Sequence, residues 1–325
     1  MRGKQAVWHG SVMDMPDARA LEDSYTHCRR IARSSARNFY YGFRLLARPK
    51  HAALCALYAF MRWVDDISDA AGDPAAKQRG LDSAREALRQ AVAGNYGGNL
   101  ILPAFHHTLE TYRIPPRYIE ELITGAEMDL TVSEYSTFDD LRAYCYRVAG
   151  TVGQCCVHVF GACDGHALDL AERLGLAFQL TNILRDLSQD LAMGRVYLPR
   201  EDFERFHCAP RELAAPPSSA LREMLRFEAE RTWRFYREGA ELLTIIPKDS
   251  RAALWAMGRI YSGILDKIEE RGYDVTTSRV RLSAAEKTGI LVQARCGWWS
   301  AENGFEKRSG DRRRTRGAVL GRGAG

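Results

Sequence analysis

Apolar residues recur at steps of three and four positions through most of the 325-residue chain, which is the spacing of one face of an α-helix. Strict alternation of apolar and polar residues, the pattern of a half-buried strand, is scarce. The chain is therefore predicted to be all-α. Clusters rich in glycine and proline predict the connections between helices of roughly 15 to 30 residues, and these clusters lie at 71–74, 94–103, 114–116, 194–200 and 209–219.

The helical pattern has no fixed-period repeat and no linker long enough to divide it, which favours a single domain. The pattern stops near residue 295. We therefore expect an N-terminal extension at 1–23, one helical domain at 24–295, and a basic tail rich in glycine and arginine at 296–325. The tail has too few apolar residues to offset the entropy of ordering it, so we expect it to be disordered.

The net charge of +5 is concentrated in this tail, where residues 301–325 hold seven basic and three acidic side chains. The rest of the chain is nearly neutral, which argues against binding to nucleic acid. No apolar run reaches the roughly 18 residues of a membrane span, and the N-terminus has no export signal. We expect a cytoplasmic protein without a transmembrane segment.

Polar residues form a stripe along one face of an otherwise apolar helix at 52–69. The stripe follows steps of three and four and consists of Tyr58, Arg62, Asp65 or Asp66, and Asp69. Asp65 and Asp69 are one turn apart, about 6 Å along the axis, so both carboxylates can face one cluster of cations. A solvated helix face is the alternative, but the flanking residues are apolar and clustered aspartates repel one another without a cation.

A second stripe lies in the apolar helix that contains residues 174–190. Asn182, Asp186 and Asp190 are spaced by four and four, so their side-chain oxygens project from one face over two turns. Arg185 stands beside them, as a cation that binds diphosphate would. Two such stripes in one neutral helical chain, each with its own arginine, indicate a shared metal site.

Oxygen ligands without histidine or cysteine select magnesium or manganese rather than zinc. Magnesium is often bridged by phosphate oxygens, so two facing acidic helices would hold the ions against a substrate diphosphate and stabilise it as a leaving group. Its departure leaves an allylic carbocation, which requires a dry apolar cavity without nucleophilic side chains.

Together with these stripes, four further segments resemble the squalene/phytoene synthase family. They are 36–43, which contains Asn-Phe-Tyr-Tyr-Gly; 144–153, which is rich in small residues; 194–199, which is Gly-Arg-Val-Tyr-Leu-Pro; and 261–275, which contains Asp-Lys-Ile-Glu and Gly-Tyr-Asp-Val. The resemblance runs from about residue 24 to residue 294. It implies an isoprenoid-synthase-like helical bundle around a central cavity, and a magnesium-dependent prenyltransferase that joins two prenyl diphosphates head to head.

The resemblance also implies roles for individual residues. The catalytic residues would be Asp65, Asp69, Asp186 and Asp190, and these four would bind magnesium together with Asn182. Substrate would be bound by Ser35, Phe39, Tyr58, Arg62, Gln179, Asn182, Arg185 and Tyr197. One departure is Gln189, where the family usually has glutamate, so the second helix carries one carboxylate fewer.

Among the family's products we expect presqualene diphosphate or squalene from two farnesyl diphosphates, because two segments resemble bacterial presqualene-type members. The segments are Asn-Phe-Tyr-Tyr-Gly and Val-Asp-Asp-Ile-Ser-Asp. The alternative is phytoene from two geranylgeranyl diphosphates. NADPH would be needed for squalene, and an apolar product would favour peripheral contact with a membrane.

Two alternatives belong to other classes of protein. A non-catalytic helical assembly factor of the same fold would be expected to have lost the aspartates, and both pairs are present here. A terpene cyclase shares the four-and-four spacing of the second stripe, but the Arg-Asp-x-x-x-Asp form and the other matching segments argue against it.

Overall fold

The computed structural model describes residues 17–36, 38–297 and 304–305. Within them the chain is helical apart from its connections and an isolated parallel bridge between Glu134 and Val196, so the expected all-α fold is confirmed. The helices are α1 (Ala18–Ser35), α2 (Phe39–Phe43), α3 (Arg48–Asp69), α4 (Pro74–Val92), α5 (Leu102–Thr111), α6 (Arg117–Thr131), α7 (Phe138–Cys145), the π-helix η1 (Tyr146–Gly150), α8 (Thr151–Phe160), α9 (Gly165–Ala192), α10 (Arg200–Arg205), the 3₁₀-helix η2 (Pro210–Ala214), α11 (Ser219–Gly239), α12 (Leu242–Ile245), α13 (Lys248–Glu270) and α14 (Ala284–Arg295).

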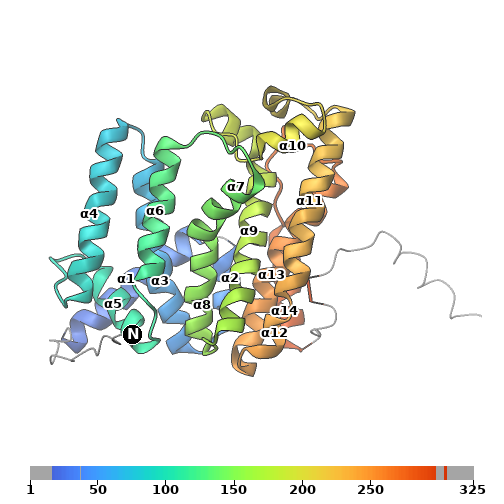
Figure 1. The fold of residues 1–325 in the computed structure, drawn as a ribbon. Helices are drawn as coiled ribbons and strands as arrows, with labels where there is room; N and C mark the ends of the chain where they lie inside the picture. Colours follow the sequence, from blue (N-terminus) through green and yellow to red (C-terminus); the bar gives the residue numbers. More distant parts are fainter. Residues whose placement is uncertain (1–16, 37, 298–303, 306–325) are drawn as a thin grey trace, which may run out of the picture.

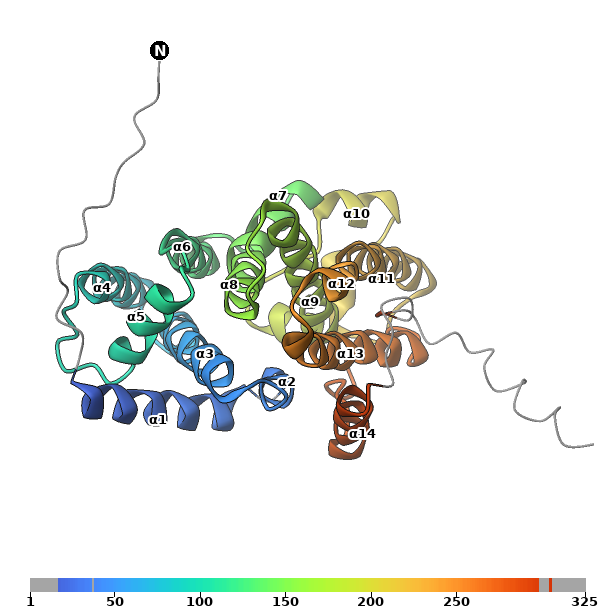
Figure 2. The same ribbon diagram turned by 90° about the horizontal axis from the view of Figure 1, so that it is seen from below.

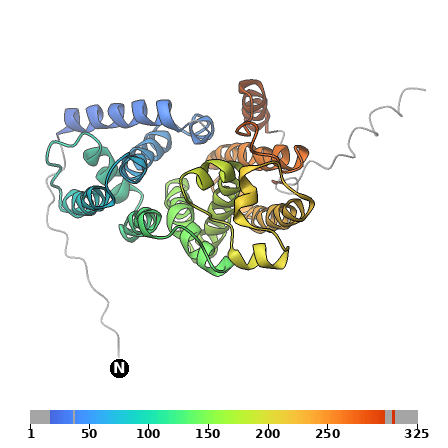
Figure 3. The ribbon, with the colours of Figure 1, turned by 90° about the horizontal axis from the view of Figure 1, so that it is seen from above.

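The long helices stand side by side in a bundle (Figure 1). Seen from below and from above, a ring of helices surrounds the centre, in which each helix contacts the next (Figures 2 and 3). The ring consists of α2, α3, α6, α8, α9 and α13. The helices α1, α4 and α5 pack on the α3 side of the ring, and α11 and α14 pack on the side of α9 and α13.

The two acidic helices predicted from the sequence are α3 and α9. Pro49 stands in the first turn of α3, where its missing N–H costs nothing and its fixed φ favours the helix. The side chain of Asp164 caps α9 by accepting a hydrogen bond from the backbone N–H of Ala167 at 3.0 Å. Although α9 has 28 residues, none of the described helices combines the length and hydropathy that crossing a membrane would need.

The segment from η1 to α8 approaches α9 very closely. A Cβ atom on Gly175 would lie 2.4 Å from the carbonyl oxygen of Ala149, and one on Gly153 would lie 2.5 Å from that of Ala171. Glycine is therefore required at both positions. The π-helical turn η1 interrupts the run of helix at this contact, and such turns are frequent at functional sites.

The two ends of the chain differ from the expected domain boundaries. Because α1 begins at Ala18, helix is already formed within the expected extension at 1–23. Phe305 lies within the expected tail, yet its side chain is 2% exposed and its ring centroid lies 6.2 Å from that of Tyr236. The side chain of Phe305 thus packs in the core, at a position where the sequence pattern gives no sign of a buried residue. The rest of the expected tail, 298–303 and 306–325, lies outside the described residues.

Candidate active site

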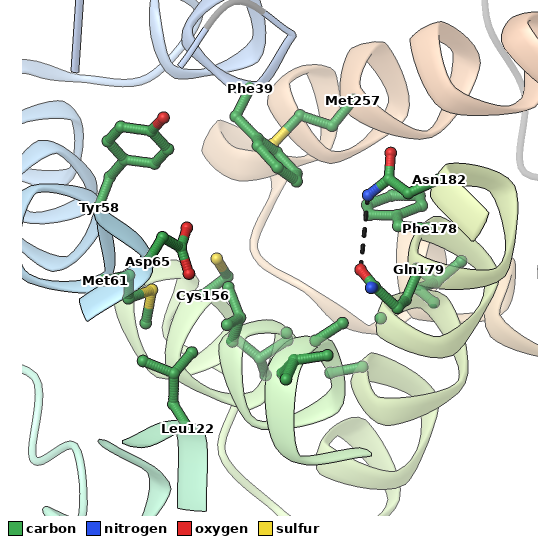
Figure 4. Close-up of a pocket in the computed structure, with 18 of the residues that line it drawn as sticks. Phe39, Tyr58, Met61, Asp65, Leu122, Cys156, Phe178, Gln179, Asn182 and Met257 are labelled. Carbon is green, nitrogen blue, oxygen red and sulfur yellow. Dashed lines mark hydrogen bonds between the residues drawn. The ribbon is translucent and has the colours of Figure 1, made fainter. Parts of the chain in front are cut away.

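A cavity of about 320 Å³ lies inside the ring of helices. Figure 4 shows Tyr58 and Asp65 of α3 on one side of it, and Gln179 and Asn182 of α9 on the other. Most of its remaining wall is apolar, and this part includes Phe39, Met61, Leu122, Val157, Phe160, Leu174, Phe178, Leu242, Leu254 and Met257.

Asp65 points into the cavity, and the surface that it exposes is part of the cavity wall (Figure 4). Burial by the surrounding protein and the charge of Asp69 raise the pKa of Asp65 to about 7, against a smaller lowering by Arg62. Arg62 is paired with Asp66, whose side chain is 55% exposed. Burial and the charge of Asp69 thus favour the protonated form of this carboxylate, and Arg62 offsets them only in part.

Gln179 and Asn182 present amide groups from α9. The Nδ2 atom of Asn182 donates a hydrogen bond to Oε1 of Gln179 at 3.5 Å (Figure 4). The side-chain oxygen of Asn182 is buried and accepts no hydrogen bond from the described residues. A buried carbonyl oxygen without a partner is uncommon in folded proteins, and this one is free to accept a ligand.

Asp186 lies one turn further along α9 and is held by two arginines. Arg185 and Arg279 each donate two hydrogen bonds to its carboxylate. Burial raises the pKa of Asp186, but these hydrogen bonds outweigh it and hold the pKa below its usual range. At the next turn, burial and the charge of Asp186 raise the pKa of Asp190 to about 7.

Asp129 of α6 also lines the cavity, although the sequence did not single it out. The hydroxyl of Tyr144 donates to its carboxylate at 3.0 Å and that of Tyr197 donates at 2.9 Å. Burial raises the pKa of Asp129. The charges of Asp69 on α3 and Asp190 on α9 both interact with that of Asp129, which places this carboxylate between the two acidic stripes.

A sequence signal for Asp129 exists in hindsight. Leu122, Ala126 and Asp129 follow at steps of four and three, and all three line the cavity from one face of α6. A carboxylate that continues an apolar helix face is a candidate for a functional residue, because burying a charge is costly unless it has a partner.

Aromatic rings gather beside the cavity. The ring of Phe178 lies 4.6 Å from that of Tyr261 and 6.2 Å from that of Phe39, and Phe39 and Tyr261 are 5.0 Å apart, measured between centroids. Phe39 and Phe178 line the cavity. Ring faces can stabilise a cationic carbon without attacking it.

The structure places five of the twelve predicted site residues at the wall of the cavity. Those that line the cavity are Phe39, Tyr58, Asp65, Gln179 and Asn182. Those that do not line it are Ser35, Arg62, Asp69, Arg185, Asp186, Asp190 and Tyr197. Ser35 ends α1, and its hydroxyl lies 3.4 Å from that of Ser34.

The donor atoms fit a hard divalent cation. All of the candidates are carboxylate or amide oxygens, the buried oxygen of Asn182 has no partner among the described residues, and the charges of Asp65 and Asp190 are poorly balanced. In the part of the chain that the structure describes, no three acidic, histidine or cysteine side chains are grouped closely enough to hold an ion as they stand.

Comparison with known proteins agrees with this site. The family model described as squalene/phytoene synthase matches residues 32–286. A phytoene synthase from Mycobacterium bovis is 36% identical over 278 residues, which cover 84% of this chain and 91% of that protein. The 15-cis-phytoene synthase of Synechocystis is 32% identical over 288 residues, which cover 85% of each chain.

Solved structures match as well. A dehydrosqualene synthase in complex with a ligand superposes with a TM-score of 0.80 at 27% identity, covering 86% of this chain and 98% of that one. A squalene synthase from Alicyclobacillus acidocaldarius superposes with a TM-score of 0.72 at 30% identity, covering 78% of this chain and 95% of that one.

Proposed function

The chain belongs to the squalene/phytoene synthase family and is a prenyltransferase of the head-to-head type, and on this basis we propose that it condenses two geranylgeranyl diphosphates to phytoene. The observation that carries this choice is the 36% identity to a phytoene synthase over most of both chains. The sequence patterns favoured farnesyl diphosphate instead. That preference rested on two short segments, which weigh less than identity along 278 residues.

Farnesyl diphosphate is the second candidate substrate. The squalene synthase of Alicyclobacillus acidocaldarius, at 30% identity, supports it. The two candidates differ in chemistry at the last step. A chain that makes phytoene ends the reaction by losing a proton, whereas formation of squalene takes up a hydride and so requires NADPH.

The acidic stripes are proposed to bind the diphosphate end of the substrate. The magnesium ligands would be Asp65, Asp69, Asn182, Asp186 and Asp190. Magnesium, which the family typically uses, would neutralise the departing diphosphate when bound. Arg62 and Arg185 would add hydrogen bonds to the phosphate oxygens, since a guanidinium group matches their geometry. Tyr58 and Gln179 line the cavity and would orient the first carbons of the chain.

The cavity wall is proposed to protect the carbocation. The rings of Phe39 and Phe178, which line the cavity, would offer their faces to the cation. Cys156 also lines the cavity and is a potential nucleophile, but burial raises the pKa of its thiol to about 12. The protonated thiol is a weak nucleophile, so the cation would survive beside it.

Asp129 is proposed to take part in proton removal. Joining the two chains to a cyclopropyl diphosphate releases one diphosphate and one proton, and conversion to phytoene releases a second of each. A carboxylate with a raised pKa at the cavity wall suits this role. The hydrogen bonds from Tyr144 and Tyr197 would fix its orientation.

The test is product analysis of the full chain with geranylgeranyl or farnesyl diphosphate, each with and without NADPH. We expect phytoene from geranylgeranyl diphosphate and no effect of NADPH. Faster turnover of farnesyl diphosphate to presqualene diphosphate or squalene would overturn the choice of substrate.

The metal assignment is tested by variants of the acidic stripes. Asp65→Asn and Asp186→Asn should abolish turnover while the protein stays folded. The control Asp82→Asn, on the exposed side of α4, should keep the native turnover. Full activity of both site variants would overturn the metal assignment.

The apolar product suggests where the enzyme works. A C40 hydrocarbon is insoluble in water, so we propose a cytoplasmic enzyme that contacts a membrane peripherally to release it. Sedimentation with lipid vesicles, with and without substrate, measures that contact.

A further inference from the structure

The carboxylate of Asp186 is fully occupied by two guanidinium groups. Nε of Arg185 lies 2.9 Å from Oδ1, and Nε of Arg279 lies 2.8 Å from the same atom. A second nitrogen of each arginine donates to Oδ2, at 2.7 Å for Arg279. A carboxylate has about four lone-pair positions, so these four hydrogen bonds leave none for another ligand.

The two arginines differ in their freedom to leave. Arg185 is the neighbour of Asp186 on α9, and its side chain is 10% exposed. Arg279 comes from the connection between α13 and α14, 93 positions away, and its side chain is 39% exposed. Arg185 is thus a fixed partner of the carboxylate, while the guanidinium of Arg279 has room to move into solvent.

The backbone beside Arg279 is held in place. Val280 is completely buried and Leu282 is 8% exposed. Arg271 donates hydrogen bonds of 3.1 Å to the carbonyl and to the hydroxyl of Ser278. Replacing Arg279 by another ligand of Asp186 therefore requires the Arg279 side chain to move, but not the connection that carries it.

The surrounding carboxylates have no such partner. Neither Asp65 nor Asp190 forms an ion pair with a described residue. A divalent cation that approaches this cluster would meet the positive charge of Arg279 at the one carboxylate that is already paired on both sides. A diphosphate in the same place would offer that guanidinium alternative oxygen acceptors.

From this geometry we propose that Arg279 competes with the divalent cation for Asp186, and that an anionic diphosphate relieves the competition, so that metal and diphosphate bind cooperatively. The proposal deepens the proposed function and rests on Asp186 being a metal ligand. Coupling between two ligands of one protein is typically about 5- to 150-fold in affinity. Arg279 would thereby weaken metal binding when no substrate diphosphate is present.

The experiment is calorimetric titration of the full chain with Mn²⁺, with no substrate and no pyrophosphate present. We expect Arg279→Gln to bind Mn²⁺ at least about fivefold more tightly than the native chain. Arg281→Gln is the matched control, because Arg281 is exposed on the same connection and does not contact Asp186; it should leave the affinity unchanged. Arg279→Lys keeps the charge without the paired geometry and should give an intermediate affinity.

The same titration with inorganic pyrophosphate completes a thermodynamic cycle. Direct contact between metal and pyrophosphate contributes equally to both proteins, so a smaller gain in the Arg279→Gln variant isolates the part due to Arg279. Unchanged or weaker Mn²⁺ binding by Arg279→Gln and Arg279→Lys, in protein that melts as the native chain does, would overturn the competition. Asp186→Asn distinguishes the metal assignment of Asp186 from the competition by Arg279. If this variant leaves the Mn²⁺ affinity unchanged, the metal assignment fails. If it weakens the affinity while the Arg279 variants leave it unchanged, only the competition fails.

Discussion

The hydroxyl of Tyr197 donates a hydrogen bond of 2.9 Å to Asp129 and so ties the segment after α9 to α6 at the cavity wall. Tyr197 is buried, and its ring centroid lies 5.2 Å from that of Tyr144, which donates to the other oxygen of the same carboxylate. Two phenols therefore fix one acidic group that faces the substrate cavity. This arrangement leads to the first prediction.

Asp129→Asn should lower kcat by about 100-fold or more, the usual contribution of an acid or base group, because the amide cannot take up a proton. KM for the prenyl diphosphate should change little. The control is Glu127→Gln on the same helix, whose carboxylate pairs with Arg85 toward α4. Steady-state kinetics measures both variants, and a kcat for Asp129→Asn within twofold of the control would contradict the role.

The stability of the metal-free protein should depend on pH through Asp65 and Asp190. Their pKa values of about 7 in the folded chain lie above the ordinary value of about 3.9, so the folded state binds more protons between the two. Their contribution to the free energy of unfolding should fall as pH rises from about 4 to about 7 and then level off. In urea unfolding with a chelator present, the free energy of unfolding of Asp65→Asn should increase relative to that of the native chain as pH rises across this range. A difference that shrinks with rising pH would contradict the shift.

The fold and the two acidic stripes could be predicted from the sequence because each depends on spacing within one helix. Asp65 and Asp69, or Asn182 and Asp186, share a face whatever the helix packs against. The partners of these residues could not be predicted in the same way. Arg279 reaches Asp186 across 93 positions, and Asp129 meets Tyr197 across 68, so both contacts exist only once the bundle has closed.

The end of the chain is the clearest case in which local pattern was insufficient. Phe305 stands among polar and charged residues and has no helical periodicity around it. Its ring nevertheless fills a space over Gly258, where an added Cβ would lie 2.0 Å from it. A single buried side chain produces no repeating apolar spacing, so the sequence pattern could not predict it.

Truncation from the C-terminus should therefore lower the free energy of unfolding only once Phe305 is removed. A chain ending at residue 305 should keep the native free energy of unfolding, whereas one ending at residue 297 should lose about 3 kcal/mol, the lower end of the usual cost of removing a buried phenylalanine side chain. Phe305→Ala in the full chain should lose a similar amount. Equal stability of the two truncated chains, measured by urea unfolding, would contradict the packing of Phe305.

Phe160 should limit the length of the prenyl chain. It lines the cavity, and Nζ of Lys50 donates to its carbonyl at 3.0 Å. Lys50 and Asp65 lie on the same helix about 22 Å apart, at 1.5 Å per residue, so Phe160 stands at the end of the cavity away from the aspartates. Phe160→Ala should raise kcat/KM for a C25 diphosphate relative to geranylgeranyl diphosphate, and Phe160→Leu should do so less. An unchanged ratio in both would place the limit elsewhere.

The last prediction concerns Gln189, where the family usually has glutamate. Gln189 lies about 100° around α9 from Asp190, its side chain is exposed, and it is not among the residues that line the cavity. If the second stripe binds magnesium, a carboxylate at this position would act on the ions through its neighbours and not as a ligand. Gln189→Glu should then lower the magnesium concentration for half-maximal activity several-fold without changing the product. Such a shift should be measurable, because indirect effects at metal sites commonly reach roughly 10- to 100-fold in affinity. Gln189→Met, which adds no charge, should leave both unchanged. An unaltered magnesium requirement in the glutamate variant would mean that position 189 faces away from the ions, and an altered product would mean that it shapes the cavity instead.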